Sequence, residues 1–414
     1  MADRFSTIAE AHNLLEYPQV QWSNKPYPVS LELFGLVKAE GIFDTRQNFT
    51  LRDGQFLYFP LNKRPDILNH DIHARGSFDA FAIETRLDFK GNGPCIGAYE
   101  SGFLIEGDFF GRTDTTINEF ELLLAFLELR SECLEFLAGQ NYHPLVFPFE
   151  SPNTISRNSG VPIAPFALCP QCKVTYKTPG LEFLAAAIGF IGERPFGIAG
   201  ADDKVFRDAL MPDFYAQIRL NNEINYVGLG FDMMRIVPRL VTNKGYKEIH
   251  PLTALSATVF ARFEYNNLIT YFKGVYSNNA STFELIGGFA VASQNPLTDI
   301  RTYTPLRTFS FFGECIRPGN FEPAIFIGIV KNLGASRRII PQLEQEVGVF
   351  GLGTNIGTVF RISPRVRWYI NSFIVGIEYE YTRATYGILN NFGQVVHTTP
   401  IANNRLLFAT YYIF

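Results

Sequence analysis

The sequence lacks any long hydrophobic run. A transmembrane helix needs roughly 18 consecutive apolar residues. The best stretch among the 414 residues, 181–191, is interrupted by Glu182 and ends in Gly-Glu-Arg at 192–194. A helical membrane protein is therefore excluded. Charge is also scarce, because Asp, Glu, Lys and Arg make up 18% of the residues and the net charge is -4. Binding through nucleic-acid phosphates requires a basic surface, so this balance argues against a nucleic-acid partner.

The first residues lack an export signal. Met1 to Phe5 show neither the apolar stretch nor the small-residue cleavage site of a secretory signal. We therefore expect any such signal to have been removed, which leaves the destination open. Residues 3–17 carry apolar side chains at near-helical spacing, and either a short helix or a loosely ordered leader fits, because isolated short helices are marginal. We assign 1–28 to an N-terminal periplasmic segment.

From Val29 onwards the apolar residues recur with a period of two. Tryptophan (2) and methionine (4) are rare whereas Phe (40) and Tyr (19) are abundant, a mixture that favours strands over helices. Charged residues occupy the alternate positions, so the two faces of each strand differ. The pattern recurs in Leu31, Leu33, Val37 and Phe43 against Glu32, Lys38, Glu40 and Asp44; in Ile83, Leu87 and Phe89 against Glu84, Arg86 and Asp88; in Phe214, Ala216 and Ile218 against Asp213, Gln217 and Arg219; and in Val366, Trp368 and Ile370 against Arg365 and Arg367.

The segment lengths indicate a barrel that spans a membrane. They run about 9 to 13 residues, as tilted membrane strands do, against about five or six for an average soluble strand. Short turns such as 221–222 and 266–267 alternate with long polar loops such as 48–76 and 202–210. Only helices and closed barrels satisfy their backbone amides inside a bilayer. We predict an all-β transmembrane antiparallel barrel of about 16 strands over 29–414, with lipid outside and water inside.

The aromatic residues and the last strand support this fold. Tyrosines near the strand ends are expected to form the interfacial girdles of the barrel, with packing in a soluble core as the alternative. Phe408, Tyr412 and Phe414 share one face of the last ten residues, and the sequence stops on Phe414. This arrangement is similar to the terminal signal by which bacterial outer-membrane proteins engage the barrel-assembly machinery. The expected girdle tyrosines are Tyr99, Tyr226, Tyr265, Tyr276 and Tyr386.

Several stretches resemble the trimeric porins of Gram-negative outer membranes, and in particular their dicarboxylate-type, DcaP-like branch. The resemblance implies a passive pore in the bacterial outer membrane, contact with outer-membrane lipid, a homotrimer, and a third long loop folded inward as a constriction. Such porins often carry basic residues along the fourth strand, whereas this chain has Glu121, Leu123 and Leu124 there, which argues against an anion-selective eyelet. The stretches that carry the resemblance are 35–39, 105–111, 139–144 and 378–383.

The proline-rich segment 144–170 is our candidate for the constriction loop, because it holds too many prolines for a strand. An extracellular flap is the alternative. Charged wall residues would complete the filter, since rings of charged side chains set ion preference. For any single wall charge the alternative is an ion pair that only stabilises the barrel. The candidate residues are Glu150, Asn153, Arg157 and Asn158 in the loop and Lys38, Glu40, Glu84, Arg86, Glu106, Glu121, Arg219, Arg262, Arg361, Arg365 and Arg367 in the wall.

The five cysteines are read mainly as disulfide partners. Cys169 and Cys172 have the CxxC spacing of redox motifs and half zinc sites, but no second CxxC or histidine pair completes a metal tetrad. In an oxidising periplasmic setting a Cys169–Cys172 disulfide is favoured over metal, and Cys95 and Cys133 are a second candidate pair. This leaves Cys315 over. We predict no metal and no cofactor.

Three classes of function remain. A diffusion channel for small hydrophilic solutes and ions is favoured, with weak selectivity because the inner face carries both signs of charge. A barrel enzyme needs a nucleophile, a base and an orienting group together, and no serine or cysteine stands in a recognisable context for one, so we predict that the chain is not an enzyme. A structural or adhesion protein that acts through its long extracellular loops is the alternative that composition leaves open.

Overall fold

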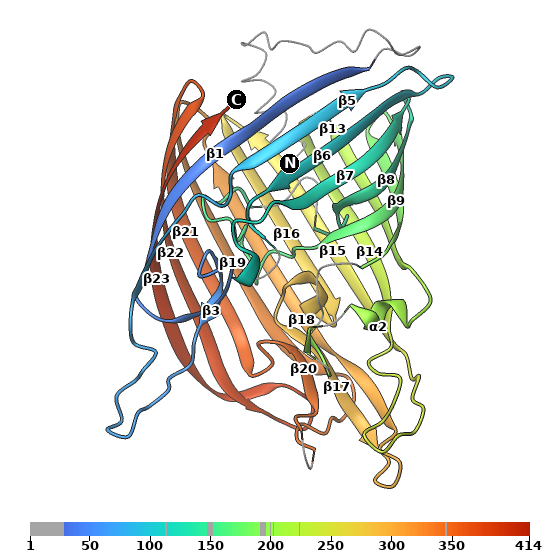
Figure 1. Ribbon diagram of the computed structural model, residues 1–414, viewed down its shortest axis with the longest axis vertical. Helices are drawn as coiled ribbons and strands as arrows, with labels where there is room; N and C mark the ends of the chain where they lie inside the picture. The colour runs from blue at the N-terminus through green and yellow to red at the C-terminus, as the bar shows by residue number, and fades with distance from the viewer. Residues whose placement is uncertain are drawn as a thin grey trace.

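The protein is a closed antiparallel β-barrel of 16 strands, as a computed structural model shows (Figure 1). The predicted fold class and strand number are confirmed. Within the described part of the chain, no helix is long and apolar enough to cross a membrane. The predicted N-terminal segment, 1–28, lies outside the described residues. The structure describes residues 29–111, 114–146, 152–190, 196–198, 200–201, 203–222, 224–343 and 346–414.

The wall follows the chain order, and each strand pairs antiparallel with its neighbours. The first strand pairs with the last from Leu36 opposite Ile413 to Asp44 opposite Arg405, which closes the barrel and leaves no open edge. The wall strands are β1 (Ser30–Asp44), β4 (Ser77–Phe81) and β5 (Arg86–Asn92) together as one interrupted strand, β6 (Glu100–Asp108), β7 (Glu121–Arg130), β8 (Leu134–Tyr142), β9 (Leu168–Thr178), β10 (Leu181–Ile188), β13 (Asp213–Asn222), β14 (Asn225–Ile236), β15 (Leu252–Tyr265), β16 (Leu268–Asn278), β18 (Arg301–Ile316), β19 (Phe321–Ala335), β21 (Ile356–Ile370), β22 (Phe373–Leu389) and β23 (Val395–Ile413).

The remaining elements are short and belong to connections between wall strands. Strands β16 and β17 both pair with β18, β17 along its first residues and β16 along the rest. The chain between them, 279–286, contains the 3-10 helix η2 and is not part of the wall. We call 279–286 the η2 segment and 48–60 the β2–β3 hairpin. These elements are β2 (Asn48–Leu51), β3 (Phe56–Pro60), β11 (Phe196–Gly197), β12 (Gly200–Ala201), β17 (Gly287–Gln294), β20 (Val349–Leu352), η1 (Asp114–Thr116), α2 (Lys204–Arg207) and η2 (Ala280–Phe283).

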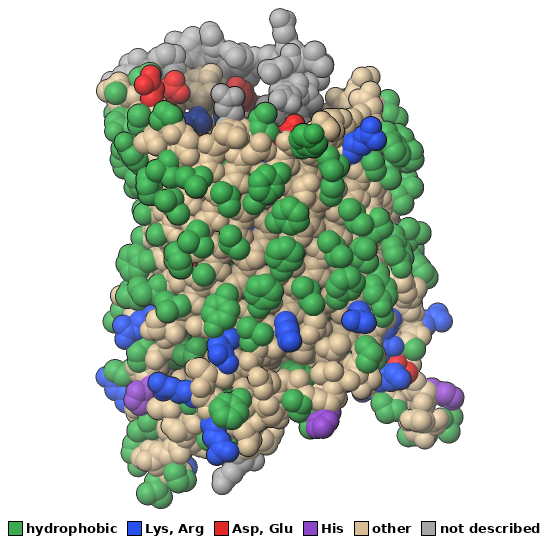
Figure 2. Space-filling model, turned by 180° about the vertical axis from the view of Figure 1, so that it is seen from behind, with side chains coloured by type: hydrophobic (Ala, Val, Ile, Leu, Met, Phe, Trp, Pro, Cys, Tyr) green, Lys and Arg blue, Asp and Glu red, His purple; other side chains and the backbone are tan. Residues whose placement is uncertain are grey.

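The outward face of the wall is apolar. Along β14, for example, Phe231 and Met233 are exposed while Asp232 between them is buried, and the same alternation runs through β15 and β22. Figure 2 shows hydrophobic side chains gathered over this wall, with lysines and arginines in a row near the lower edge of the face in view. An apolar outer surface of this extent suits lipid and not water.

Two of the tyrosines predicted for the interfacial girdles face the barrel interior instead. Tyr226 and Tyr386 are buried on the inward face, where the Arg219 guanidinium lies over the ring of Tyr226 and the Tyr386 hydroxyl donates to the Pro60 carbonyl at 2.7 Å. The alternation along each strand assigns the faces, and both residues fall on the inward set. Tyr265 and Tyr276 are exposed and fit the prediction.

The interior of the barrel contains protein segments as well as the inward side chains of the wall. Apolar residues of the β2–β3 hairpin, the loop between β8 and β9 and the η2 segment pack together and against inward wall residues such as Phe312 and Phe326. Phe283, Leu285 and Ile286 of the η2 segment are fully buried. The inserted segments therefore bring their own apolar core into the barrel.

Candidate functional site: the barrel interior

Residues 152–167 of the β8–β9 loop are held by wall side chains that bind their backbone. The backbone N–H of Asn153 donates to the Glu314 carboxylate at 3.0 Å, and the backbone N–H of Ile155 donates to the Glu378 carboxylate. From β21, the Arg367 guanidinium donates to the carbonyl oxygens of Asn153 at 2.8 Å and Thr154 at 3.1 Å. Backbone groups inside the barrel need partners, and here acidic and basic wall residues supply them.

Arg157 of the loop reaches the opposite part of the wall. Its guanidinium lies 3.1 Å from Asp108 and 3.7 Å from Glu84. Glu84 also pairs with Lys38, whose ammonium group lies 2.8 Å from Glu40 and donates to the Ile155 carbonyl at 2.8 Å. Four predicted site residues, Lys38, Glu40, Glu84 and Arg157, thus form one connected ionic network around the loop.

Arg361 links three parts of the structure. Its side chain is fully buried and lies 3.2 Å from Glu380 of β22. It donates to the Val161 carbonyl of the loop at 2.6 Å and to the Leu57 carbonyl of the β2–β3 hairpin at 3.0 Å. Asn158 of the loop donates to the same Glu380 carboxylate at 3.2 Å. One guanidinium therefore fastens both insertions to the wall, and such charge-assisted bonds are the strong ones.

The other predicted wall charges also face inward and are paired. Most pairs join neighbouring strands, as expected for cross-strand neighbours on one face. Glu121 is half-buried on β7, and Glu150 lies outside the described residues. The pairs are Arg86 with Glu106 at 3.0 Å, Arg219 with Glu182 at 2.6 Å, Arg262 with Glu264 at 2.8 Å, Arg365 with Glu314 at 2.7 Å and Arg367 with Glu322 at 3.2 Å. This pairing favours the structural interpretation of many of these charges.

The loop ends earlier than predicted. Strand β9 begins at Leu168, so Pro170 belongs to a strand and not to the loop. Its missing N–H costs little there. The Pro170 carbonyl accepts a hydrogen bond from Gly189, and the last β10 pair is Ile188 with Gln171, so Pro170 faces a position just beyond β10. A proline is tolerated where the sheet requires no donor.

The predicted disulfides are wrong. Cys169 is buried and Cys172 is exposed, and all five cysteines are free. Residues three apart in a strand point to opposite faces, so the β9 geometry separates the two thiols. The CxxC spacing brings two thiols together only in a turn or a helix, and here both cysteines lie in a strand. Cys95 and Cys133 lie exposed at two different turns and do not pair either.

Sequence reasoning missed the carboxylates that hold the loop. Glu314, Glu378 and Glu380 are all buried on the inward face. Their inward position followed from the alternation, but the same pattern places many other polar residues inward. These three carboxylates differ from the other inward residues only because the loop passes beside them, so no local sequence signal identified them. His143, Asp213 and Asp232, which meet at the root of the loop, were missed for the same reason.

A cluster of ion pairs near the start of β18 joins the β14–β15 loop to the β17–β18 loop. Arg239 lies 3.0 Å from Asp299 and 2.8 Å from Glu248, and the Arg301 guanidinium donates to Asp299 at 2.9 Å. Burial alone would raise the pKa of Asp299, but hydrogen bonds from Gln294, Arg239 and neighbouring groups outweigh it and lower the pKa to about 2. The carboxylate is therefore charged at neutral pH and holds these loops together.

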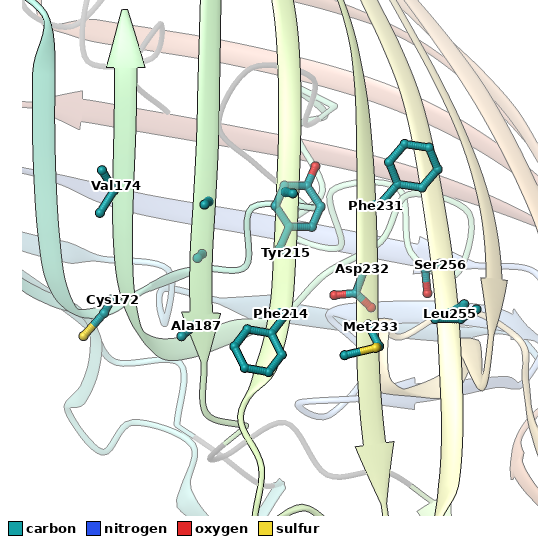
Figure 3. Close-up of a pocket in the computed structure, with 13 residues that line it drawn as sticks. Cys172, Val174, Ala187, Phe214, Tyr215, Phe231, Asp232, Met233, Leu255 and Ser256 are labelled. Atoms are coloured by element: carbon teal, nitrogen blue, oxygen red, sulfur yellow. The ribbon is translucent and has the colours of Figure 1, made fainter.

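A depression in the wall lies over strands β9, β10 and β13 to β15. Figure 3 shows Phe214, Phe231, Met233 and Leu255 around it, and their side chains belong to the exposed, outward set. Ala185, Ala187 and Ala216 form its floor, and their small side chains leave the hollow between the larger neighbours. The buried, inward residues Tyr215, Asp232 and Ser256 also line it, so the depression adjoins the interior side chains of these strands.

No family profile and no curated protein match the chain by sequence. By structure, the chain is similar to the outer membrane channel DcaP of Acinetobacter baumannii, with a TM-score of 0.68, 15% identity, and coverage of 93% of this chain and 97% of that chain. It is also similar to OmpT of Vibrio cholerae in its trimer form (TM-score 0.54, 11% identity, 93% and 99% coverage) and to OmpF of Salmonella typhi (TM-score 0.50, 14% identity, 95% and 100% coverage). At these identities the likeness concerns the fold alone. The chain therefore shares the fold of these outer-membrane proteins, a closed 16-stranded antiparallel barrel.

Proposed function

We propose that the protein is a passive channel for small hydrophilic solutes and ions in the bacterial outer membrane, and not an enzyme. The observation that carries this proposal is the closed barrel with an apolar outer surface and charged inner face. A barrel of this kind exposes its outside to lipid while its inside offers a polar route across the membrane. The likeness to the channel DcaP supports the same conclusion.

The β8–β9 loop is proposed as the constriction. Its backbone contacts to Glu314, Glu378 and Arg367 support this, since they hold the loop against the inner wall at several points along the chain. Charges of both signs surround it, and they are largely paired with one another. We therefore expect a narrow pore with weak ion selectivity.

A homotrimer is proposed as the assembled form, supported by the trimer recorded for OmpT of Vibrio cholerae. We also propose that the C-terminal strand carries the assembly signal, since Phe408 and Tyr412 face outward from β23.

Planar-bilayer recording tests the proposal. Purified, correctly folded protein is expected to give ohmic current in three equal steps, with a reversal potential close to zero under a salt gradient. Folded protein that passes no current would refute the channel, and a large reversal potential would refute weak selectivity.

The constriction is tested with Arg367→Ala. This change frees the Asn153 and Thr154 carbonyls, so conductance per pore is expected to rise. Lys177→Ala removes an exposed ion pair with Glu135 at the other side of the barrel and serves as the control, with unchanged conductance. Equal conductance in both variants would show that the loop does not limit the current.

A further inference from the structure

Three side chains that can bind metal meet at the root of the β8–β9 loop. His143 follows the last residue of β8, Asp213 begins β13 and Asp232 lies in β14. The His143 Nε2 atom is 3.3 Å from Asp213 Oδ2 and 3.4 Å from Asp232 Oδ1. One ligand atom from each residue falls within 4.8 Å of the other two. The barrel thus brings together one imidazole and two carboxylates from distant parts of the sequence.

The cluster is buried and its carboxylates are poorly satisfied. His143 is fully buried, and Asp213 and Asp232 are 4% and 3% exposed. Within the described part of the chain, Asp213 Oδ1 and both oxygens of Asp232 accept no hydrogen bond, and a donor atom, His143 Nε2, lies 3.4 Å from Asp232 Oδ1. A buried carboxylate without partners is costly, so protein interiors retain such groups where they are paired or coordinate a metal. These orphaned oxygens point to a missing cation.

The imidazole is held in a fixed orientation. The Leu145 amide donates to His143 Nδ1 at 3.0 Å, and this bond turns Nε2 toward the two carboxylates. The rings of Phe190 and Phe283 pack against the imidazole, with centroids 5.7 and 5.1 Å away. These contacts aim Nε2 at the two carboxylates.

We propose that His143, Asp213 and Asp232 bind one divalent transition-metal ion, with Zn²⁺ as the best fit. One nitrogen and two oxygen donors suit Zn²⁺ completed by water, whereas Ca²⁺ takes six to eight oxygen ligands, more than these two carboxylates supply. A divalent ion also neutralises the two carboxylates. Coordination displaces the proton from Nε2. The ring then carries its proton on Nδ1, and the Leu145 amide turns away.

The bound ion would fix the start of the constriction loop. The His143 amide donates to the Ala167 carbonyl at 3.0 Å, so the two ends of the loop meet at this residue. Next to it, the Lys273 ammonium group donates to the Val146 carbonyl at 3.1 Å. A metal bridge from His143 to β13 and β14 adds a tether to the wall beside that of Lys273. The site goes beyond the proposed channel function and does not depend on it.

Zinc titration of the purified, chelator-treated protein in detergent tests the proposal. Calorimetry and elemental analysis are expected to give one Zn²⁺ per chain. Asp232→Asn keeps the shape of the side chain and removes one ligand charge, so affinity is expected to fall about 100-fold or more, since even changes beyond the ligands cost up to about that much. The folded state of each variant is checked by circular dichroism and by heat-dependent mobility in gels. Should Asp232→Asn not fold, Asp213→Asn takes its place.

His70→Asn is the control. His70 lies 3.4 Å from Asp66 in an exposed loop, so this change removes a surface His–Asp pair and is expected to leave the titration unchanged. The proposal is overturned if the wild type binds less than one ion, or if the folded Asp variants bind as the wild type does. It is equally overturned if His70→Asn abolishes binding or if Ca²⁺ competes as well as Zn²⁺.

Discussion

The barrel has two unlike sides. The long-strand wall, formed by β18, β19, β21, β22, β23 and β1, has strands of 15 to 19 residues and presents charged side chains to the interior. The short-strand wall, β7 to β10, has strands of 8 to 11 residues. Its buried inward side chains include Leu123, Leu124, Leu137, Leu184 and Ile188.

Outward, the two walls are alike. Phe408 and Ile377 on the long-strand wall and Leu127 and Phe183 on the short-strand wall are exposed apolar residues. Under the proposed function the outward positions face lipid or a neighbouring subunit, and both surroundings favour apolar side chains. Inward positions face different insertions, so the loop backbone meets charged side chains of the long-strand wall, whereas the short-strand wall combines buried leucines with charges such as Glu182. The surroundings of each face, and not the strand itself, set its chemistry.

The largest effect is expected where a charge of the long-strand wall is removed. Arg361→Ala breaks a fully buried pair and leaves Glu380 and two backbone carbonyls without this donor. We expect a loss of about 3–5 kcal/mol of unfolding free energy, measured by urea unfolding in detergent. Arg383→Ala, an exposed outward residue of the neighbouring strand, is the control. A loss below about 1 kcal/mol for Arg361→Ala, the range of exposed pairs, would contradict the stabilising role of the inward charges.

A charge placed on the outward face should cost less. Val259 lies midway along β15 and is 53% exposed, yet the proposed surroundings are lipid. Val259→Arg is expected to lose about 2–4 kcal/mol of stability, as arginine does at the middle of a bilayer. Val241→Arg makes the same change at a 56% exposed position in a loop and should lose about 0.5 kcal/mol or less. Equal effects at the two positions, in protein folded into lipid vesicles, would show that lipid does not face Val259.

Strong acid should loosen the loops that Asp299 holds together. The pKa of Asp299 is lowered from 3.8 to about 2 by the hydrogen bonds that outweigh its burial, so its contribution is complete above about pH 4 and disappears as the pH falls toward 2. Hydrogen exchange of the Asn243 amide, which donates to Asp299 at 3.1 Å, is expected to accelerate over this interval beyond the intrinsic pH dependence. Asp299→Asn should lack that transition. An identical transition in the variant would assign the effect to another group.

The smallest effect is expected at an exposed pair of the short-strand wall. Lys177 lies 2.8 Å from Glu135, but its side chain is 47% exposed. Water screens such pairs, so Lys177→Ala should change the unfolding free energy by less than about 1 kcal/mol. A loss comparable to that of Arg361→Ala would mean that burial does not separate the two kinds of ion pair.

The sequence predicted the wall better than its contents. Alternation of apolar and charged residues placed Lys38 and Glu40 inward and Val37 and Phe43 outward, and the structure agrees. The same rule places Tyr226 and Tyr386 inward, so the register of a strand predicts the face of a tyrosine better than its aromatic character does. For Cys169 and Cys172, spacing was read without the strand that contains it.

The loop and its partners were beyond local reasoning. Prolines marked the β8–β9 connection as a loop, yet nothing in its sequence specifies that Asn153 meets Glu314 or that Val161 meets Arg361, residues more than 150 positions away. The same holds for His143 and Asp232. Such contacts depend on the closure of the barrel, which brings strands from both ends of the chain around a common interior.

By itself, the sequence determined which residues of each strand share the apolar face and which share the polar face, because a period of two is a local property that survives any arrangement of the strands. Only the tertiary structure decided what fills the barrel and which inward charges pair. Those outcomes depend on the path of three insertions through the enclosed space, and the energy of each contact exists only after the first and last strands have joined.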